Sequence, residues 1–228
     1  MGFPGDYSIQ QRDRLFNNIL IHHKPSLIIF FDGRNDAHYT TFKKYLPFNA
    51  NVGIWKSLQK GSFDETKPKL FFNTSKLITN KINFLKEFYK KRIKSDYLIT
   101  DAIEDNIKKG INIYNDVGND VEVQLSNLNI KFIRVLQPTL FVSNRQYTES
   151  ENKFIKDYTA RYRINNNLDK YKILINKFYN EANKNNEKYF YNLQDIFEDI
   201  REEVYVDTVH YSDTGNEIIA NKICKIID

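Results

Sequence analysis

The stretch Ser26–Asp36, SLIIFFDGRND, predicts the fold class of this chain of 228 residues. Its centre, Leu27–Phe31, is a continuous apolar run with turn residues on both sides. A short run of this kind is typical of a strand buried on both faces, as in a parallel sheet. The polar residues Asp32–Asp36 would then lie at the carboxyl end of the strand, where open α/β sheets bind ligands.

Strands and helices are expected to alternate on both sides of this run. A helix is predicted from about Ser8 to His22, before the first strand, and two later strands are predicted at Asn129–Leu136 and Tyr189–Leu193. Asp101–Leu128 has the pattern of another helix or of a broken pair, with weak points at Gly110 and Gly118. Further helices are predicted from the capping box Thr148-x-x-Glu151 to about Tyr162, over Leu168–Asn183, and over the apolar run Ile218–Ile226. The alternation indicates an α/β fold with a parallel sheet.

The whole chain, residues 1–228, is interpreted as a single domain with a helical insertion or cap at residues 37–100. Tyr39–Lys69 mixes aromatic residues with glycine and proline, and Leu70–Lys94 has the apolar spacing of an amphipathic helix. This region is too long for an ordinary strand-to-helix connection, so we expect it to form an element of its own.

Composition narrows the possible partners. The net charge is +5, but the basic residues are interspersed with acidic ones, so no nucleic-acid-binding arm is expected. No apolar run approaches the roughly 20 residues of a membrane span. The single cysteine, Cys224, excludes an internal disulfide, fits a cytoplasmic location and is expected to be a core residue. No cofactor or metal is expected, since the histidines lack ligand spacing, and His38 is expected to be solvated.

A second polar cluster lies in Val204–Ala220, VYVDTVHYSDTGNEIIA. Asp207 and His210 stand three residues apart in a loop-like run, just before a helix whose N-cap would be Ser212 or Asp213. A carboxylate that orients an imidazole forms the base half of a nucleophile–His–Asp device. The alternative is a surface loop in which the histidine simply bonds a nearby aspartate.

Polar residues follow the first two predicted strands as well. They are Gly33 and Asp36 after the first strand and Gln137 after the second. Because the carboxyl ends of parallel strands meet on one rim of a sheet, these residues are expected to bind substrate near His210.

Three motifs in this order resemble the SGNH (GDSL-like) hydrolase family. They are Gly5 in a turn before a helix, Gly-x-Asn-Asp at residues 33–36, and Asp-x-x-His at residues 207–210. The resemblance covers nearly the whole chain in order. It implies a flavodoxin-like, three-layer α/β/α fold and the hydrolysis of esters, without a cofactor.

The resemblance also implies roles for the motif residues. His210 would be the general base and Asp207 its orienting partner, while the Asn35 amide and the Gly5 backbone N–H would donate to an oxyanion hole. Fixed N–H donors stabilise the charge that develops on an attacked ester carbonyl, and losing one typically costs about 3–4 kcal/mol in the barrier. The alternatives are an ordinary turn at Gly33 and Asn35, and an ordinary glycine at position 5.

The chain departs from the family pattern at the nucleophile. The family carries its serine in a Gly-Asp-Ser turn after the first strand, whereas here one residue is inserted in Gly5-Asp6-Tyr7-Ser8 and no strand precedes it. Our preferred interpretation is that the nucleophile strand is missing from this chain, Met1 is not the true start, and Ser8 caps a helix. In the alternative, Ser8 is the nucleophile. The missing strand would leave Leu27–Phe31 as an open edge, through which the chain would self-associate.

The expected function is therefore esterase-type hydrolysis of an acyl ester on a small molecule or carbohydrate, with O-acetyl esters among the candidates. Two alternatives remain: a catalytically inactive remnant that acts as a binding module, and an O-acyltransferase that uses the same residues.

Overall fold

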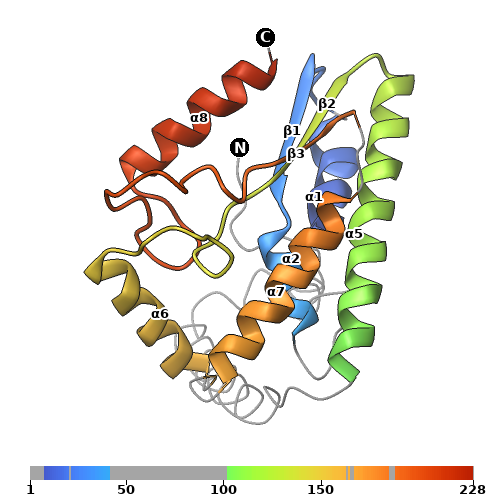
Figure 1. Cartoon of the computed structure of the whole chain (residues 1–228). Coiled ribbons are helices and arrows are strands. Elements are labelled where there is room, and N and C mark those ends of the chain that lie inside the picture. The colour runs from blue at the N-terminus through green and yellow to red at the C-terminus, as the bar shows by residue number, and fades with distance from the viewer. Residues whose placement is uncertain are drawn as a thin grey trace, which may run out of the picture.

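The computed structural model describes residues 8–20, 22–41, 102–162, 164, 167–184 and 188–227. These residues form a three-layer α/β structure around a parallel sheet (Figure 1). The sheet contains β1 (Leu27–Asp32), β2 (Lys131–Leu136) and β3 (Phe190–Asn192), in that spatial order. The predicted fold class is thus confirmed, and each strand lies within two residues of its predicted bounds.

Apart from the helix at Arg34–Thr40, which no sequence pattern predicts, the helices also follow the sequence patterns closely. They are α1 (Ser8–Arg14), the π-helical η1 (Leu15–Ile19), α2 (Arg34–Thr40), α5 (Ala102–Asn127), α6 (Glu149–Tyr162), α7 (Leu168–Asn183) and α8 (Asp213–Ile227). The capping box before α6 is present, because the Thr148 N–H donates to Glu151 Oε2 at 3.0 Å and the Glu151 N–H donates to Thr148 Oγ1 at 3.3 Å. The predicted insertion is described only as far as residue 41, since residues 42–101 lie outside the described ranges.

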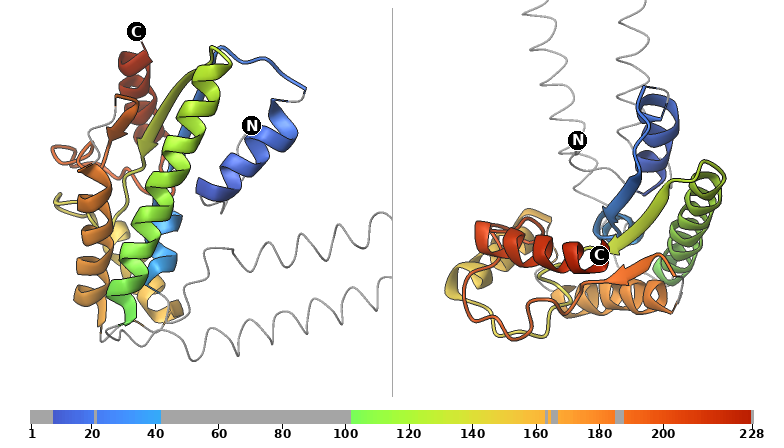
Figure 2. Two further views of the ribbon diagram at one scale, coloured as in Figure 1. Left: turned by 90° about the vertical axis from the view of Figure 1, so that its right-hand side faces the viewer. Right: turned by 90° about the horizontal axis from the view of Figure 1, so that it is seen from above.

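Alternate strand residues build two different packing layers. Ile28, Phe30 and Phe132 belong to a cluster with Leu15 of η1 and with α5 residues, including Val121. The residues between them, Leu27, Phe31, Ile133 and Val135, belong to a second cluster that includes Ile219 of α8. Figures 1 and 2 show α5 and α8 on opposite sides of the sheet, as this alternation requires.

The prediction that Leu27–Phe31 is buried on both faces is wrong in part. β2 is buried from Phe132 to its end, but the first half of β1 is only half-buried and Ile29 is 37% exposed. The reason is position: within the described residues β1 pairs with β2 alone and therefore lies at an edge. Self-association through this edge stays a prediction.

A buried ion pair joins β1 and β2. Arg134 is 2% exposed, and its Nε and Nη2 lie 3.3 Å from the two carboxylate oxygens of Asp32. The Tyr114 hydroxyl donates to the same carboxylate at 2.9 Å, and its ring centre lies 3.4 Å from the guanidinium carbon. α5 is a single helix and not a broken pair, and Gly118, one of its predicted weak points, makes room for this guanidinium, which a Cβ there would overlap.

Two further observations concern the exposure of Cys224 and the apolar length of the helices. Cys224 is exposed on α8, which corrects the expectation that it is a core residue. Within the described part of the chain, no helix is long and apolar enough to cross a membrane.

Candidate active site

The segment between β3 and α8 holds Asp207 and His210 in a tight loop. The Val206 N–H donates to the His210 carbonyl at 3.0 Å, and the Ser212 N–H donates to the Val204 carbonyl at 2.9 Å. The first turn of α8 packs directly against this loop, because Gly215 approaches the Val204 carbonyl so closely that a Cβ would overlap it.

The start of α8 is capped as the sequence predicts. The Ser212 hydroxyl accepts a hydrogen bond from the Gly215 N–H at 3.2 Å, which satisfies one of the open donors of the first turn. The cap therefore fixes where the loop ends and the helix begins.

Asp207 uses both carboxylate oxygens to organise the loop. Its Oδ1 accepts the backbone N–H groups of Val209 at 2.7 Å and of His210 at 2.8 Å. Its Oδ2 lies 2.6 Å from His210 Nδ1. One oxygen thus shapes the backbone turn while the other orients the imidazole.

The charge on Asp207 determines which nitrogen of His210 carries the proton. Partial burial acts to raise the pKa of Asp207, but hydrogen bonds from the His210 ring and from the His210 and Val209 backbone outweigh it, so the net pKa is below its ordinary value. The carboxylate is therefore ionised at neutral pH and favours the imidazole tautomer that carries its proton on Nδ1. In that tautomer Nε2 has no proton, as a general base requires.

The loop is tied to the segment that follows β2. The Thr208 carbonyl accepts the Thr139 hydroxyl at 3.1 Å and the Leu140 N–H at 3.3 Å, and the Tyr211 hydroxyl donates to the Pro138 carbonyl at 2.7 Å. The side chain of His210 is 68% exposed, but its backbone is held in place by these contacts.

A pocket of about 580 Å³ lies beside this histidine. Its lining comes from three separate parts of the chain: the start of α2, the middle of α6 and the loop at residues 207–210. The charged and hydrogen-bonding residues that α2 and α6 contribute are Arg34, Asp157, Tyr158 and Arg161. A general base and several polar groups therefore converge on one concave surface, the usual arrangement of a small-molecule site.

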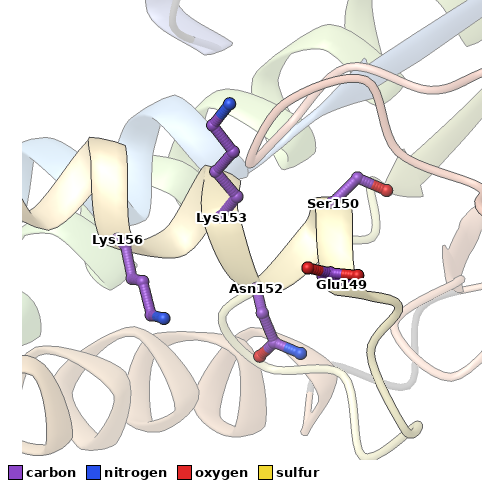
Figure 3. Close-up of a pocket in the computed structure, with 5 residues that line it drawn as sticks. All are labelled: Glu149, Ser150, Asn152, Lys153 and Lys156. Atoms are coloured by element: carbon purple, nitrogen blue, oxygen red, sulfur yellow. The ribbon is translucent and has the colours of Figure 1, made fainter.

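A second, larger hollow of about 930 Å³ lies along α6 (Figure 3). Its lining residues, Glu149, Ser150, Asn152, Lys153 and Lys156, all come from this one helix. Among them there is no histidine, and their one hydroxyl group, that of Ser150, donates a hydrogen bond to the exposed carboxylate of Glu203. We therefore place the candidate site at the smaller pocket, where the oriented imidazole lies.

The Gly-x-Asn-Asp motif reaches this pocket through Arg34, the residue before Asn35. Asn35 itself is half-buried and is not among the lining residues; its Oδ1 accepts a hydrogen bond from Arg34 Nη1 at 3.5 Å. Its role as an oxyanion donor stays a prediction. Gly5, the other predicted donor, lies outside the described residues.

The predicted substrate-binding residues lie at the carboxyl ends of β1 and β2 but do not line the pocket. Gly33 is buried with φ +97°, and a Cβ there would overlap Leu136, so the turn itself requires glycine. Gln137 Nε2 donates to the Tyr211 hydroxyl at 3.4 Å. Asp36 is buried and faces α1.

Ser8, the alternative nucleophile, is fully buried against Asp36. Its hydroxyl donates to Asp36 Oδ1 at 2.6 Å, and its backbone N–H lies 3.3 Å from both oxygens of this carboxylate. The serine thus begins α1 and is held there by a carboxylate from α2. Within the described part of the chain, no hydrogen bond joins it to His210.

The burial of Asp36 beside Asp32 predicts a pH-dependent contribution to stability. Burial, and then the charge of Asp32, raise the pKa of Asp36 from 3.8 to about 6, although the hydrogen bonds from Ser8 oppose them. Because the folded pKa is raised, this stabilising contribution is present below pH 4 and is lost as the pH rises through about 6. The difference amounts to about 3 kcal/mol at most.

We expect Asp36→Asn to gain stability relative to the unsubstituted chain between pH 4 and pH 7. Urea unfolding of both proteins at each pH measures the difference, and Asp195→Asn, an exposed aspartate, is the matched control. A constant difference across this range would contradict the raised pKa.

The local sequence patterns miss several polar residues in and near the pocket. His38 is buried, not solvated, and its Nδ1 lies 2.8 Å from the Tyr171 hydroxyl and 2.9 Å from the Tyr158 hydroxyl. Burial, and then the charge of Arg34, hold the pKa of His38 well below its ordinary value. No sequence pattern points to Arg34 or Arg161 either; the one available signal is the position of Arg34 inside the predicted motif.

No group of histidine, cysteine or acidic side chains in the described ranges is arranged to hold a metal ion. Comparison of the chain with protein-family models, with curated proteins and with solved structures finds no match.

Proposed function

We propose that the chain hydrolyses an acyl ester, with His210 as the general base and Asp207 as the group that orients it. One observation carries this proposal: a carboxylate 2.6 Å from Nδ1 leaves Nε2 as the basic nitrogen at the edge of a pocket. The order of the three sequence motifs supports assignment to the SGNH hydrolases.

The proton moves in two steps in this mechanism. His210 Nε2 takes the proton from the attacking hydroxyl as the oxygen bonds to the ester carbonyl carbon. The resulting imidazolium is stabilised by the Asp207 carboxylate and then gives its proton to the departing alkoxide. The negative charge on the carbonyl oxygen would be stabilised by the Asn35 amide, a donor that stays uncharged.

The attacking hydroxyl belongs either to a serine or to a water molecule. A fluorophosphonate probe separates the two, because it forms a covalent bond only with an activated side chain. We expect the purified chain to hydrolyse 4-nitrophenyl acetate in either case. Labelling that Ser8→Ala abolishes would identify Ser8 as the nucleophile, and labelling that persists in Ser8→Ala would assign this role to another side chain.

A failure of the purified chain to hydrolyse 4-nitrophenyl esters of acetate, succinate and pentanoate would contradict the proposal.

The second candidate, a non-catalytic binding module, has one observation in its favour: among the described residues, no hydroxyl group donates a hydrogen bond to His210. Binding of an ester without turnover would be the corresponding result. The third candidate, an O-acyltransferase, would yield an acylated product when an alcohol acceptor is added.

A further inference from the structure

A buried cation lines the candidate pocket. Arg34 is 8% exposed, and its guanidinium keeps its charge at any pH at which proteins are folded. Nη2 donates to the Tyr158 hydroxyl at 3.0 Å, Nη1 donates to the Asn35 Oδ1 at 3.5 Å, and the guanidinium carbon lies 5.6 Å from the Tyr158 ring centre. A hydroxyl, an amide and an aromatic ring carry no net charge, so none of them balances the arginine.

The nearby carboxylates are engaged with other groups. Asp207 binds His210, and Asp36 binds Ser8. Asp157 lines the same pocket but is exposed to solvent, and within the described ranges it forms no ion pair with Arg34. His38 adds no negative charge either. Among the described residues, then, no carboxylate balances this buried charge, and an unbalanced buried charge favours the arrival of an anion.

We propose that the ester substrate carries an oxyanion group, a carboxylate or a phosphate, which binds Arg34. This inference rests on the proposed function, because it assigns the ester to the pocket of His210. The planar guanidinium matches the paired oxygens of either group. Arg34 and His210 line one pocket of about 580 Å³, so a single small molecule can place its anion at one and its ester carbonyl at the other.

The test compares two esters of similar size that differ in charge: the mono-4-nitrophenyl ester of succinate, which carries a carboxylate, and neutral 4-nitrophenyl pentanoate. We expect the unsubstituted chain to prefer the charged ester by its kcat/KM. Arg34→Gln keeps hydrogen-bonding groups but removes the charge, and it should lower this preference by about ten- to a hundredfold.

The matched control is Arg201→Gln, which removes an exposed arginine that does not line the pocket. Because water and salt screen an exposed charge, this substitution should change the preference by less than about threefold. An equal loss for both esters in Arg34→Gln would overturn the inference, since the arginine would then act on the reacting carbonyl and not on a substrate anion.

A binding measurement separates this inference from the proposed function. Calorimetric titration with succinate, inorganic phosphate and the neutral succinamide needs no turnover. If either anion binds and Arg34→Gln weakens its binding at least tenfold, the inference is supported even if no ester is hydrolysed. The anion that binds more tightly identifies the oxyanion group of the substrate as a carboxylate or a phosphate. Hydrolysis of neutral esters without anion binding would overturn the inference and leave the function intact. If Arg34→Gln does not fold, the preference of the unsubstituted chain for succinate over succinamide decides the question.

Discussion

Replacing His210 with alanine is expected to lower kcat/KM for acetyl-ester hydrolysis by about a hundredfold to ten-thousandfold, the usual contribution of a general base. The fold should remain intact, because the imidazole is exposed and its one hydrogen bond to the described part of the chain is with Asp207. Initial rates with 4-nitrophenyl acetate measure the loss, and circular dichroism checks the fold.

Two further variants make this result specific. His23→Ala removes another exposed histidine, outside the pocket, and should leave kcat/KM unchanged. Asp207→Asn should also lower kcat/KM strongly, because an amide N–H facing Nδ1 would move the imidazole proton to Nε2 and block the base. Equal rates for His210→Ala and His23→Ala would contradict the assignment of the base.

Replacing Arg134 with methionine is expected to lower the free energy of unfolding by about 3–5 kcal/mol. The substitution leaves the Asp32 carboxylate buried, and among the described residues the Tyr114 hydroxyl still donates to it. Urea unfolding followed by circular dichroism measures the change.

A second substitution and a surface pair provide the controls. Adding Asp32→Asn to Arg134→Met should restore part of the lost stability, because no unpaired charge then remains in the core. Lys184→Met breaks an exposed pair with Glu181 and should cost less than about 1 kcal/mol. If Arg134→Met costs no more than Lys184→Met, the buried pair does not stabilise the sheet.

Where a local pattern determines an element, the sequence predicts it well. The bounds of α7 coincide with its apolar spacing, and the capping box of α6 forms as expected. For Cys224 the prediction is wrong although the local pattern contains the answer. It is exposed, whereas the half-buried Ile223 and Ile226 pack against the core, so a stricter count of the helical period places it outward.

The burial of β1 is not predictable from its own residues. Its apolar run is as continuous as that of a central strand, but its exposure depends on which strands stand beside it. The neighbours of a strand are set by tertiary structure, so an apolar run alone cannot separate an edge strand from a central one.

In the candidate site, too, contacts between residues close in sequence are predictable and contacts between distant residues are not. Asp207 and His210 are close in sequence, so their local spacing is enough to predict that they interact. Arg34 and Tyr158 are 124 positions apart, and only the packing of α6 against α2 brings them together. A polar residue whose partners are distant in sequence leaves no local signal of burial.

Chemical rescue tests the central claim, that the imidazole at position 210 removes a proton from the attacking hydroxyl. The cavity left in His210→Ala opens onto the solvent-exposed side of the pocket, so free imidazole can reach it. All rates are compared after the protein-free rate at the same imidazole concentration has been subtracted. We predict that added imidazole then raises the rate of 4-nitrophenyl acetate hydrolysis by His210→Ala to a saturating value, while the rate of the unsubstituted chain does not change. Identical imidazole dependence with and without the His210→Ala protein would contradict the account.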